Sequence, residues 1–105
     1  MTDIPWTCIT RVALEVQTSL DEPWTLDAMA GRAGYEAGHF AKTYHRIVGR
    51  PPVDHVRALR LERAAHALDT TDRSVTTVAM DAGFGSPDAF TRAFRRRFGC
   101  SPTSF

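Results

Sequence analysis

The feature that most constrains this chain is an internal repeat, in which a pattern of about 25 residues occurs twice along the 105-residue sequence. The two copies match at a shift of 49 residues in their first halves and 50 in their second halves. Nine positions pair residues of the same physical type: Leu26 with Val75, Met29 with Val78, Ala30 with Ala79, Gly34 with Gly83, Tyr35 with Phe84, Phe40 with Phe90, Tyr44 with Phe94, Gly49 with Gly99 and Pro52 with Pro102. Because self-similarity of this kind indicates a repeated structural unit, we expect two copies of one small motif.

Each copy predicts a helix, a tight turn and a second helix. In the first copy, Thr25 is a suitable N-cap, and the apolar residues after it recur at i, i+3 and i+4, as on the buried side of a helix. Gly34 and Gly83 can adopt the positive φ that ends such a helix. The second helices are predicted over about 36–48 and 86–98. Their apolar faces are expected to hold Phe40, Tyr44 and Ile47 in one copy and Phe90, Phe94 and Phe98 in the other.

Two further helices fit around the repeats. An amphipathic first helix is expected to end at residues 21–23, and its apolar residues are Ile9, Val12, Ala13, Val16 and Leu20. A helix is also predicted over 53–68, and its inward-facing residues are Val56, Leu59, Ala64, Ala65 and Leu68. No strand pattern occurs, so we expect an all-α fold of about six to seven helices. It comprises a first helix-turn-helix subdomain over 1–50, a linker helix over 51–69 and a second helix-turn-helix subdomain over 70–105.

Composition excludes several classes of protein. A hydrophobic fraction of 43% is too high for a disordered tail, and no apolar run approaches the roughly 18 residues of a membrane span. The N-terminus lacks a basic region followed by an apolar one, so a soluble, unexported chain without membrane contact is expected. Cys8 and Cys100 have no metal-ligand spacing and are expected to be reduced thiols. His39 and His45 are badly spaced for a metal on one helix, so neither a metal site nor a cofactor is predicted.

Charge is unevenly distributed along the sequence. The formal net charge is only +1, but residues 1–35 carry two basic and five acidic side chains. Residues 36–50 carry three basic side chains against one acidic, and residues 70–105 carry five against three. Basic charge is therefore concentrated in two windows about fifty residues apart, each at one copy of the repeat, which points to nucleic acid as the partner.

A duplicated helix-turn-helix is either a scaffold in a small helical bundle or a DNA-binding element whose second helix enters the major groove. In the second copy, the first helix contains no basic residue, whereas the second helix holds Arg92, Arg95, Arg96 and Arg97. This placement favours a DNA-binding function. The alternative is a helical protein-interaction module without DNA binding. We expect no enzyme and no catalytic residues, because no phosphate loop, paired carboxylates or nucleophile constellation is present.

The segment from Gly83 to Pro102, GFGSPDAFTRAFRRRFGCSP, resembles the signature of the AraC/XylS transcriptional regulators. The helix predicted over 74–82 matches the helix before that signature, and residues 60–68 resemble the family's linker helix. The resemblance covers about residues 8–105. It implies a homeodomain-like fold of two helix-turn-helix subdomains that read adjacent major-groove segments of double-stranded DNA, and hence a sequence-specific transcriptional regulator.

Carried over position by position, the resemblance implies which side chains contact DNA. The groove-reading positions are Gly38, His39, Ala41 and Lys42 in the first copy and Pro87, Asp88, Thr91 and Arg92 in the second. The positions toward phosphate are His45 and Arg46 in the first copy and Arg95 and Arg96 in the second. Glu36 stands where the family usually has a serine cap, which predicts a weaker start of the helix over about 36–48, the first of the two reading helices. Because Gly38 and Ala41 carry almost no side chain, this helix is expected to read DNA mainly through Lys42, His39 and DNA shape. Arg97 lies nearer the buried side and is expected to pair with an acid such as Asp81.

The resemblance also implies partners and a setting. RNA polymerase is an expected partner, and the expected location is the bacterial cytoplasm, at the nucleoid. The family normally continues into a short final helix, so a stop at Phe105 suggests part of something longer, and an effector-binding domain after Phe105 is one expectation. A free-standing regulator is another. The DNA-binding half of a fusion protein such as a DNA-repair alkyl transferase is an alternative, although Cys100 has no evident activating group.

Overall fold

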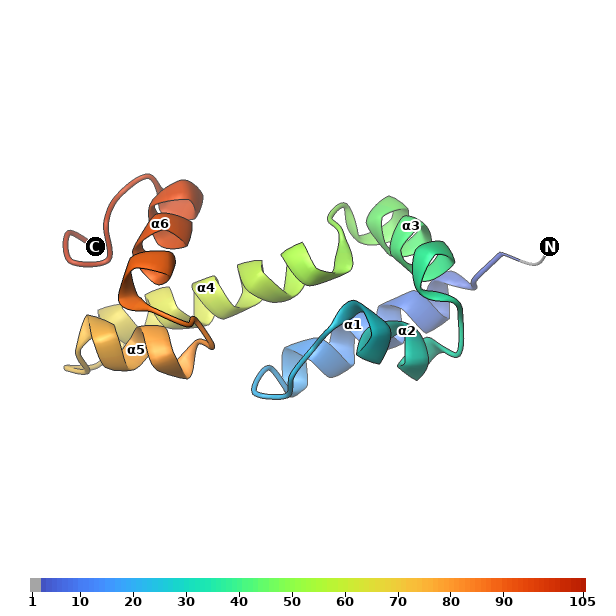
Figure 1. Ribbon diagram of the computed structural model, residues 1–105, viewed down its shortest axis with the longest axis horizontal. Helices are drawn as coiled ribbons and strands as arrows, with labels where there is room; N and C mark the ends of the chain where they lie inside the picture. Colours follow the sequence, from blue (N-terminus) through green and yellow to red (C-terminus); the bar gives the residue numbers. More distant parts are fainter. Residues whose placement is uncertain (1–2) are drawn as a thin grey trace. The chain divides into compact units, whose positions relative to one another are not determined.

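The computed structural model describes residues 3–105, and within that range its regular elements are all helices (Figure 1). They are α1 (Trp6–Thr18), α2 (Leu26–Ala33), α3 (Ala37–Val48), α4 (Pro52–Thr70), α5 (Val75–Asp81) and α6 (Pro87–Phe98). The chain divides into two compact units, Met1–Arg57 and Ala58–Phe105, with the boundary inside α4. The predicted all-α fold with two helix-turn-helix pairs, α2–α3 and α5–α6, is confirmed. In residues 3–105, no helix has both the length and the apolarity that crossing a bilayer requires.

The helix boundaries follow from side-chain caps and from glycines with positive φ. Thr25 caps α2, since its hydroxyl accepts a hydrogen bond from the Ala28 N–H at 3.1 Å. Ser74 caps α5 in the same way. Gly34 has φ +78° and ends α2, a conformation that costs other residues more because of their Cβ. The helix-turn-helix boundaries expected from these residues are therefore confirmed to within about one residue.

The core of the first unit lies between α1, α2 and α3. Its fully buried side chains are Ile9, Val12 and Val16 from α1, Met29 from α2, Phe40, Thr43 and Tyr44 from α3, and Val56 from the start of α4. Two expectations are wrong here. Leu20 lies beyond α1, which ends at Thr18, and Ile47 is 38% exposed rather than part of the apolar face. Thr43 takes the buried position instead, and its hydroxyl is satisfied by the His39 carbonyl at 3.0 Å.

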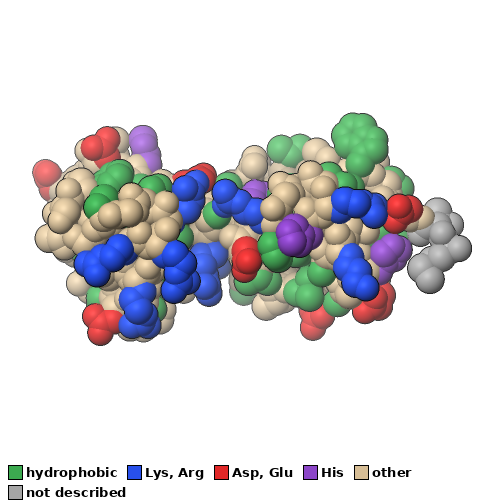
Figure 2. All heavy atoms as spheres, turned by 90° about the horizontal axis from the view of Figure 1, so that it is seen from above, with side chains coloured by type: hydrophobic (Ala, Val, Ile, Leu, Met, Phe, Trp, Pro, Cys, Tyr) green, Lys and Arg blue, Asp and Glu red, His purple; other side chains and the backbone are tan. Residues whose placement is uncertain are grey.

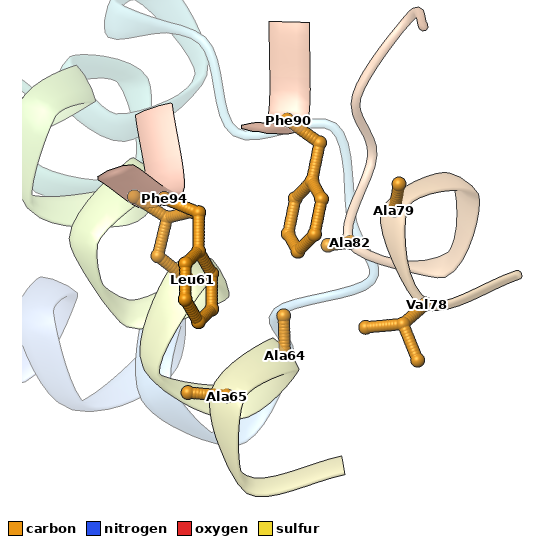
Figure 3. Close-up of a cluster of buried hydrophobic side chains, with 8 residues drawn as sticks. All are labelled: Leu61, Ala64, Ala65, Val78, Ala79, Ala82, Phe90 and Phe94. Carbon is orange, nitrogen blue, oxygen red and sulfur yellow. The ribbon is translucent and has the colours of Figure 1, made fainter. Parts of the chain in front are cut away.

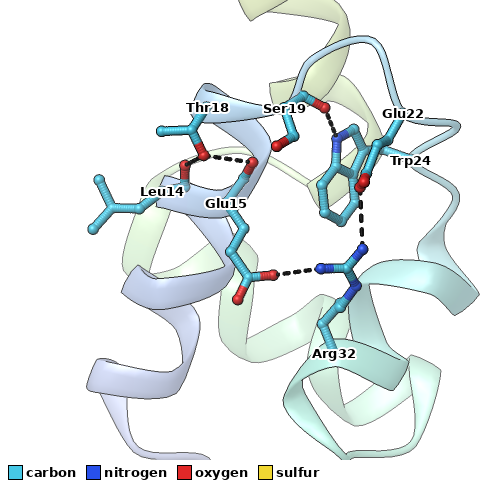
Figure 4. Close-up of polar contacts among 7 residues, drawn as sticks. All are labelled: Leu14, Glu15, Thr18, Ser19, Glu22, Trp24 and Arg32. Atoms are coloured by element: carbon cyan, nitrogen blue, oxygen red, sulfur yellow. Dashed lines mark hydrogen bonds and ion pairs between the residues drawn. The ribbon is translucent and has the colours of Figure 1, made fainter.

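A polar network around Arg32 ties α2 to α1 and to the α1–α2 loop (Figure 4). Its guanidinium donates to Glu15 at 3.0 Å and to Glu22 at 3.1 Å. The same guanidinium lies 5.1 Å from the ring centroid of Trp24, whose indole N–H donates to the Ser19 carbonyl at 2.8 Å. Arg32 therefore has a structural role in the first unit and is not a free cation for a ligand.

The core of the second unit is a cluster in which α4, α5 and α6 meet (Figure 3). Its members are Leu61, Ala64 and Ala65 from α4, Val78 and Ala79 from α5, Ala82 after α5, and Phe90 and Phe94 from α6. The inward-facing set predicted for α4 is partly wrong, because Leu59 and Leu68 are only half-buried while Ala58 and Leu61 are buried. The rings of α6 continue the cluster outward, since Phe94 contacts Phe105 with a centroid separation of 5.3 Å.

Candidate nucleic-acid interface

The first reading helix, α3, begins at a carboxylate cap. Both oxygens of Glu36 accept backbone hydrogen bonds, from the Gly38 N–H at 2.8 Å and from the His39 N–H at 2.9 Å. These two bonds hold the pKa of Glu36 below its ordinary value. The expectation that Glu36 weakens the helix start is therefore wrong. A carboxylate satisfies two of the unpaired N–H groups of the first turn, and its charge suits the positive end of the helix dipole.

Gly38 has a role that sequence reasoning missed. A Cβ at this position would lie 3.2 Å from Oε1 and 3.3 Å from Oε2 of Glu36. The glycine therefore leaves room for the carboxylate to reach both N–H groups. The sequence does contain a signal for this role, since Glu36 and Gly38 are two residues apart at the start of a predicted helix.

The outward face of α3 is basic. Lys42, His45 and Arg46 are exposed, and His39 and Ala41 are half-buried, on the sides of the helix away from Phe40 and Tyr44. Lys42, His45 and Arg46, together with Gly49, line an open hollow of about 460 Å³. Five of the six positions predicted in this copy thus lie along α3 with side chains that reach its surface, and the sixth, Gly38, is exposed at its start.

Asp3 lies against this basic face, which the sequence did not predict. One carboxylate oxygen is 3.2 Å from Arg46 Nη2, and the other is 3.7 Å from His39 Nε2. The ring of His39 also meets Tyr35 edge to face, with centroids 6.1 Å apart. Asp3 and Arg46 are separated by 43 residues, and no local pattern indicates such a contact.

The second reading helix, α6, begins at a hydroxyl cap. The Ser86 hydroxyl accepts from the Ala89 N–H at 3.1 Å, and Pro87 occupies the first helical position, as predicted. Phe90 and Phe94 are fully buried on the inner side. The predicted DNA-contacting residues lie on the remaining sides, where Pro87, Asp88, Arg92, Arg95 and Arg96 are exposed and Thr91 is half-buried. Lys and Arg side chains are visible on the surface of each unit in Figure 2.

Arg97 differs from the other arginines of α6. Its guanidinium donates to Glu62 of α4 at 2.8 Å and lies 5.3 Å from the centroid of the Phe98 ring. The expected pairing with Asp81 is wrong, because Asp81 forms its ion pair with Arg73. Arg97 therefore fastens α6 to α4 in the second unit, while Arg92, Arg95 and Arg96 stay on the outward surface.

The two helices α3 and α6 carry matching basic side chains. At the shift of 50 residues that relates the copies, Lys42 corresponds to Arg92, His45 to Arg95 and Arg46 to Arg96. Each pair has exposed members at equivalent places on α3 and α6. The second helix of each helix-turn-helix pair therefore has exposed basic side chains on its outer face.

Metal-binding groups do not gather in the described part of the chain. Across residues 3–105, no three His, Cys, Asp or Glu side chains are placed to hold one ion. Cys8 and Cys100 are free thiols, each half-buried.

Comparison with known proteins identifies this arrangement. A family model described as a helix-turn-helix domain matches residues 29–105. Regulatory protein SoxS of Escherichia coli (strain K12) is 31% identical over 90 residues, which are 86% of this chain and 84% of that protein. The right origin-binding protein of the same strain is 35% identical over 86 residues, 82% of this chain, and the matched part spans only 30% of that protein's length.

Among solved structures, the DNA-binding domain of AdpA, a global transcriptional factor crystallised with a target DNA, has a TM-score of 0.85 at 29% identity, over 98% of this chain and 89% of that one. The match covers α1 to α6 rather than a single helix pair. It agrees with the signature around α6 and with the duplicated helix-turn-helix. The chain belongs to the AraC/XylS family of transcriptional regulators and has the architecture of that family's DNA-binding domain.

Proposed function

We propose that this chain regulates transcription by binding double-stranded DNA sequence-specifically, with α3 and α6 entering adjacent major-groove segments. The observation that carries the proposal is the pairing of exposed basic side chains at equivalent positions of the two helices, with Lys42 matching Arg92 and Arg46 matching Arg96. A basic outer face on the second helix of a helix-turn-helix suits DNA phosphates and base edges. The crystallisation of the similar AdpA domain with its target DNA supports the same use of this fold.

Within each helix, the proposed roles divide between bases and phosphates. The groove-reading residues are Gly38, His39, Ala41 and Lys42 on α3 and Pro87, Asp88, Thr91 and Arg92 on α6. His45 and Arg46 on α3, and Arg95 and Arg96 on α6, would contact phosphate. Lys42 and Arg92 carry most of the base discrimination, because long cationic side chains donate to guanine O6 and N7. These contacts are the same for a free-standing regulator and for one with an effector-binding domain after Phe105.

The experiment is selection of sites from random DNA, followed by footprinting and a measurement of stoichiometry. Entry of α3 and α6 into successive major grooves on one face of DNA, which are about 34 Å apart, predicts an asymmetric site of roughly 20 base pairs occupied by one chain. Lys42→Ala with Arg92→Ala should abolish the preference while the helical circular dichroism is kept. A palindromic site occupied only by two chains, or binding without any sequence preference, would contradict the proposal.

RNA polymerase is the proposed protein partner, and the bacterial nucleoid in the cytoplasm is the proposed location. Support comes from SoxS, a regulatory protein by name, of which the chain covers 84%. The test is a mobility shift with the selected site, the chain and purified polymerase. The proposal predicts a ternary complex more stable than either binary complex, and independent binding of the two proteins would contradict it.

A further inference from the structure

The basic face of α3 already holds an anion that belongs to the chain itself. The carboxylate of Asp3 spans two residues seven apart on α3, with His39 at one end and Arg46 at the other. Residues seven apart lie on the same side of a helix, and Lys42 lies between them on that side. The Asp3 carboxylate therefore pairs with Arg46, the proposed phosphate contact of α3, and lies near His39, a proposed groove-reading residue.

The neighbours of Asp3 in sequence hold it in this place. Ile4 is only 3% exposed, so the segment is anchored in the core of the first unit. The Pro5 carbonyl accepts from the Cys8 N–H at 3.0 Å and thereby starts α1. The contact with α3 is thus a feature of a packed segment.

Within residues 3–105, the equivalent arginine of the second reading helix, α6, has no such carboxylate partner. Arg96 corresponds to Arg46 at the shift of 50 residues, and no ion pair involves Arg96 within residues 3–105. The acid near α6, Asp88, lies in its own first turn, where a negative charge suits the helix dipole. Arg46 and Arg96 occupy equivalent positions, but only Arg46 is paired with a carboxylate of the chain.

We infer that Asp3 is a built-in competitor of DNA phosphate at the first reading helix. In the free chain its carboxylate contacts Arg46 and His39, and a DNA phosphate displaces it from these side chains on binding. The inference rests on the proposed function, because it assigns a role to Asp3 within the same interface. It predicts that Asp3 weakens the phosphate contacts of α3 and lowers the number of counterions released on binding.

The experiment measures binding of the full chain to a non-specific duplex of about 25 base pairs, between about 50 and 200 mM salt. Asp3→Asn should bind about twofold to fivefold more tightly at the low end, as expected for loss of a surface ion pair. The slope of log K against log salt should steepen by up to about 0.9. Asp69→Asn removes the same charge from an exposed place at the end of α4 and should change both quantities less.

A second measurement separates local competition from a change in net charge. In an Arg46→Ala background, Asp3→Asn should have a smaller effect than in the unaltered chain, because the main group for which the carboxylate competes is gone. Equal effects in both backgrounds, or binding by Asp3→Asn no tighter than by Asp69→Asn, would overturn the inference and leave the proposed function intact. Absence of DNA binding by the unaltered chain would overturn both.

Discussion

The hydroxyl of Tyr44 and Nδ1 of His55 lie 2.6 Å apart and share a hydrogen bond that joins α3 to the first turn of α4. Tyr44 is fully buried, and the two rings have centroids 5.8 Å apart. Burial raises the pKa of Tyr44 to about 12. In the second unit, eleven residues likewise separate Phe94 and Phe105, whose rings contact each other without a hydrogen bond. At equivalent positions, the first unit therefore has a hydrogen bond between Tyr44 and His55, and the second unit has an apolar ring contact between Phe94 and Phe105.

Tyr44→Phe is expected to destabilise the chain by about 1–3 kcal/mol, because it leaves the His55 nitrogen without this bond while keeping the ring. The measurement is urea unfolding at neutral pH. Tyr35→Phe removes the chain's other phenol hydroxyl and is the control. If the two variants were equally stable, the Tyr44–His55 bond would contribute nothing.

The raised pKa of Tyr44 predicts a loss of stability in alkali. The folded chain holds the phenol proton more tightly than the unfolded chain, so the contribution is complete below about pH 10 and is lost as the pH rises toward 12. The difference between the unaltered chain and Tyr44→Phe should shrink by about 2 kcal/mol over this interval. The free energy of unfolding at pH 9, 10, 11 and 12 tests this. A constant difference would show that the phenol does not titrate with folding.

The lowered pKa of Glu36 predicts the opposite direction in acid. Its ionised form caps α3 above the ordinary pKa of 4.5, and this contribution is lost as the pH falls through the lower, folded value. Glu36→Gln should be less stable than the unaltered chain at pH 7, and the gap should narrow toward pH 3. Ser86→Ala removes the neutral cap of α6, so its deficit should not change with pH over this range. Parallel losses in both variants would contradict the carboxylate cap.

Gly38→Ala tests whether the glycine serves the cap. Alanine in a helix is worth about 0.5–1 kcal/mol over glycine, but here the new Cβ would lie 3.2 Å from the Glu36 carboxylate. The gain should therefore appear only in a Glu36→Ala background. Gly31→Ala in α2, where a Cβ meets nothing within 4 Å, should stabilise the chain in either background. A full gain from Gly38→Ala alone would mean that the carboxylate simply moves aside.

On α6, base reading and phosphate contact are expected to separate. Arg92→Ala should cost about 1–3 kcal/mol of binding and relax the preference at one position of the site. Arg96→Ala should weaken all sequences alike and reduce the salt slope by about one unit. Arg97→Ala is the matched control, because Arg97 is paired with Glu62 and should affect stability more than DNA preference. A change of preference with Arg96→Ala and none with Arg92→Ala would reverse the roles.

The duplicated fold was predictable because its signals are local. Caps such as Thr25 and Ser86, and the glycine at position 34, act within four residues of themselves, and apolar spacing sets which side of a helix is buried. The outward placement of Lys42 and Arg92 follows from that spacing, because each lies on the side of its helix away from the buried rings.

The remaining features depend on contacts between residues that are distant in the sequence, or on which of two residues on one helix face is buried. Asp3 meets Arg46 across 43 residues, and Arg97 selects Glu62 rather than Asp81 because of how α6 packs on α4. Thr43 and Ile47 both lie at helical spacing from Phe40, yet Thr43 is buried, with its hydroxyl bonded to the His39 carbonyl, and Ile47 is exposed. The two ion pairs leave no periodic trace in the sequence, and helical spacing alone does not separate the buried Thr43 from the exposed Ile47.

The ring contact between Phe94 and Phe105 has a consequence for temperature. Contacts between apolar rings weaken on cooling, because the hydration of apolar surface has a large heat capacity. Cold should therefore loosen the segment after α6 before it affects the hydrogen-bonded counterpart in the first unit. The contacts that follow α3 and α6 are thus expected to weaken under different conditions, the Tyr44–His55 bond in alkali and the Phe94–Phe105 contact in the cold.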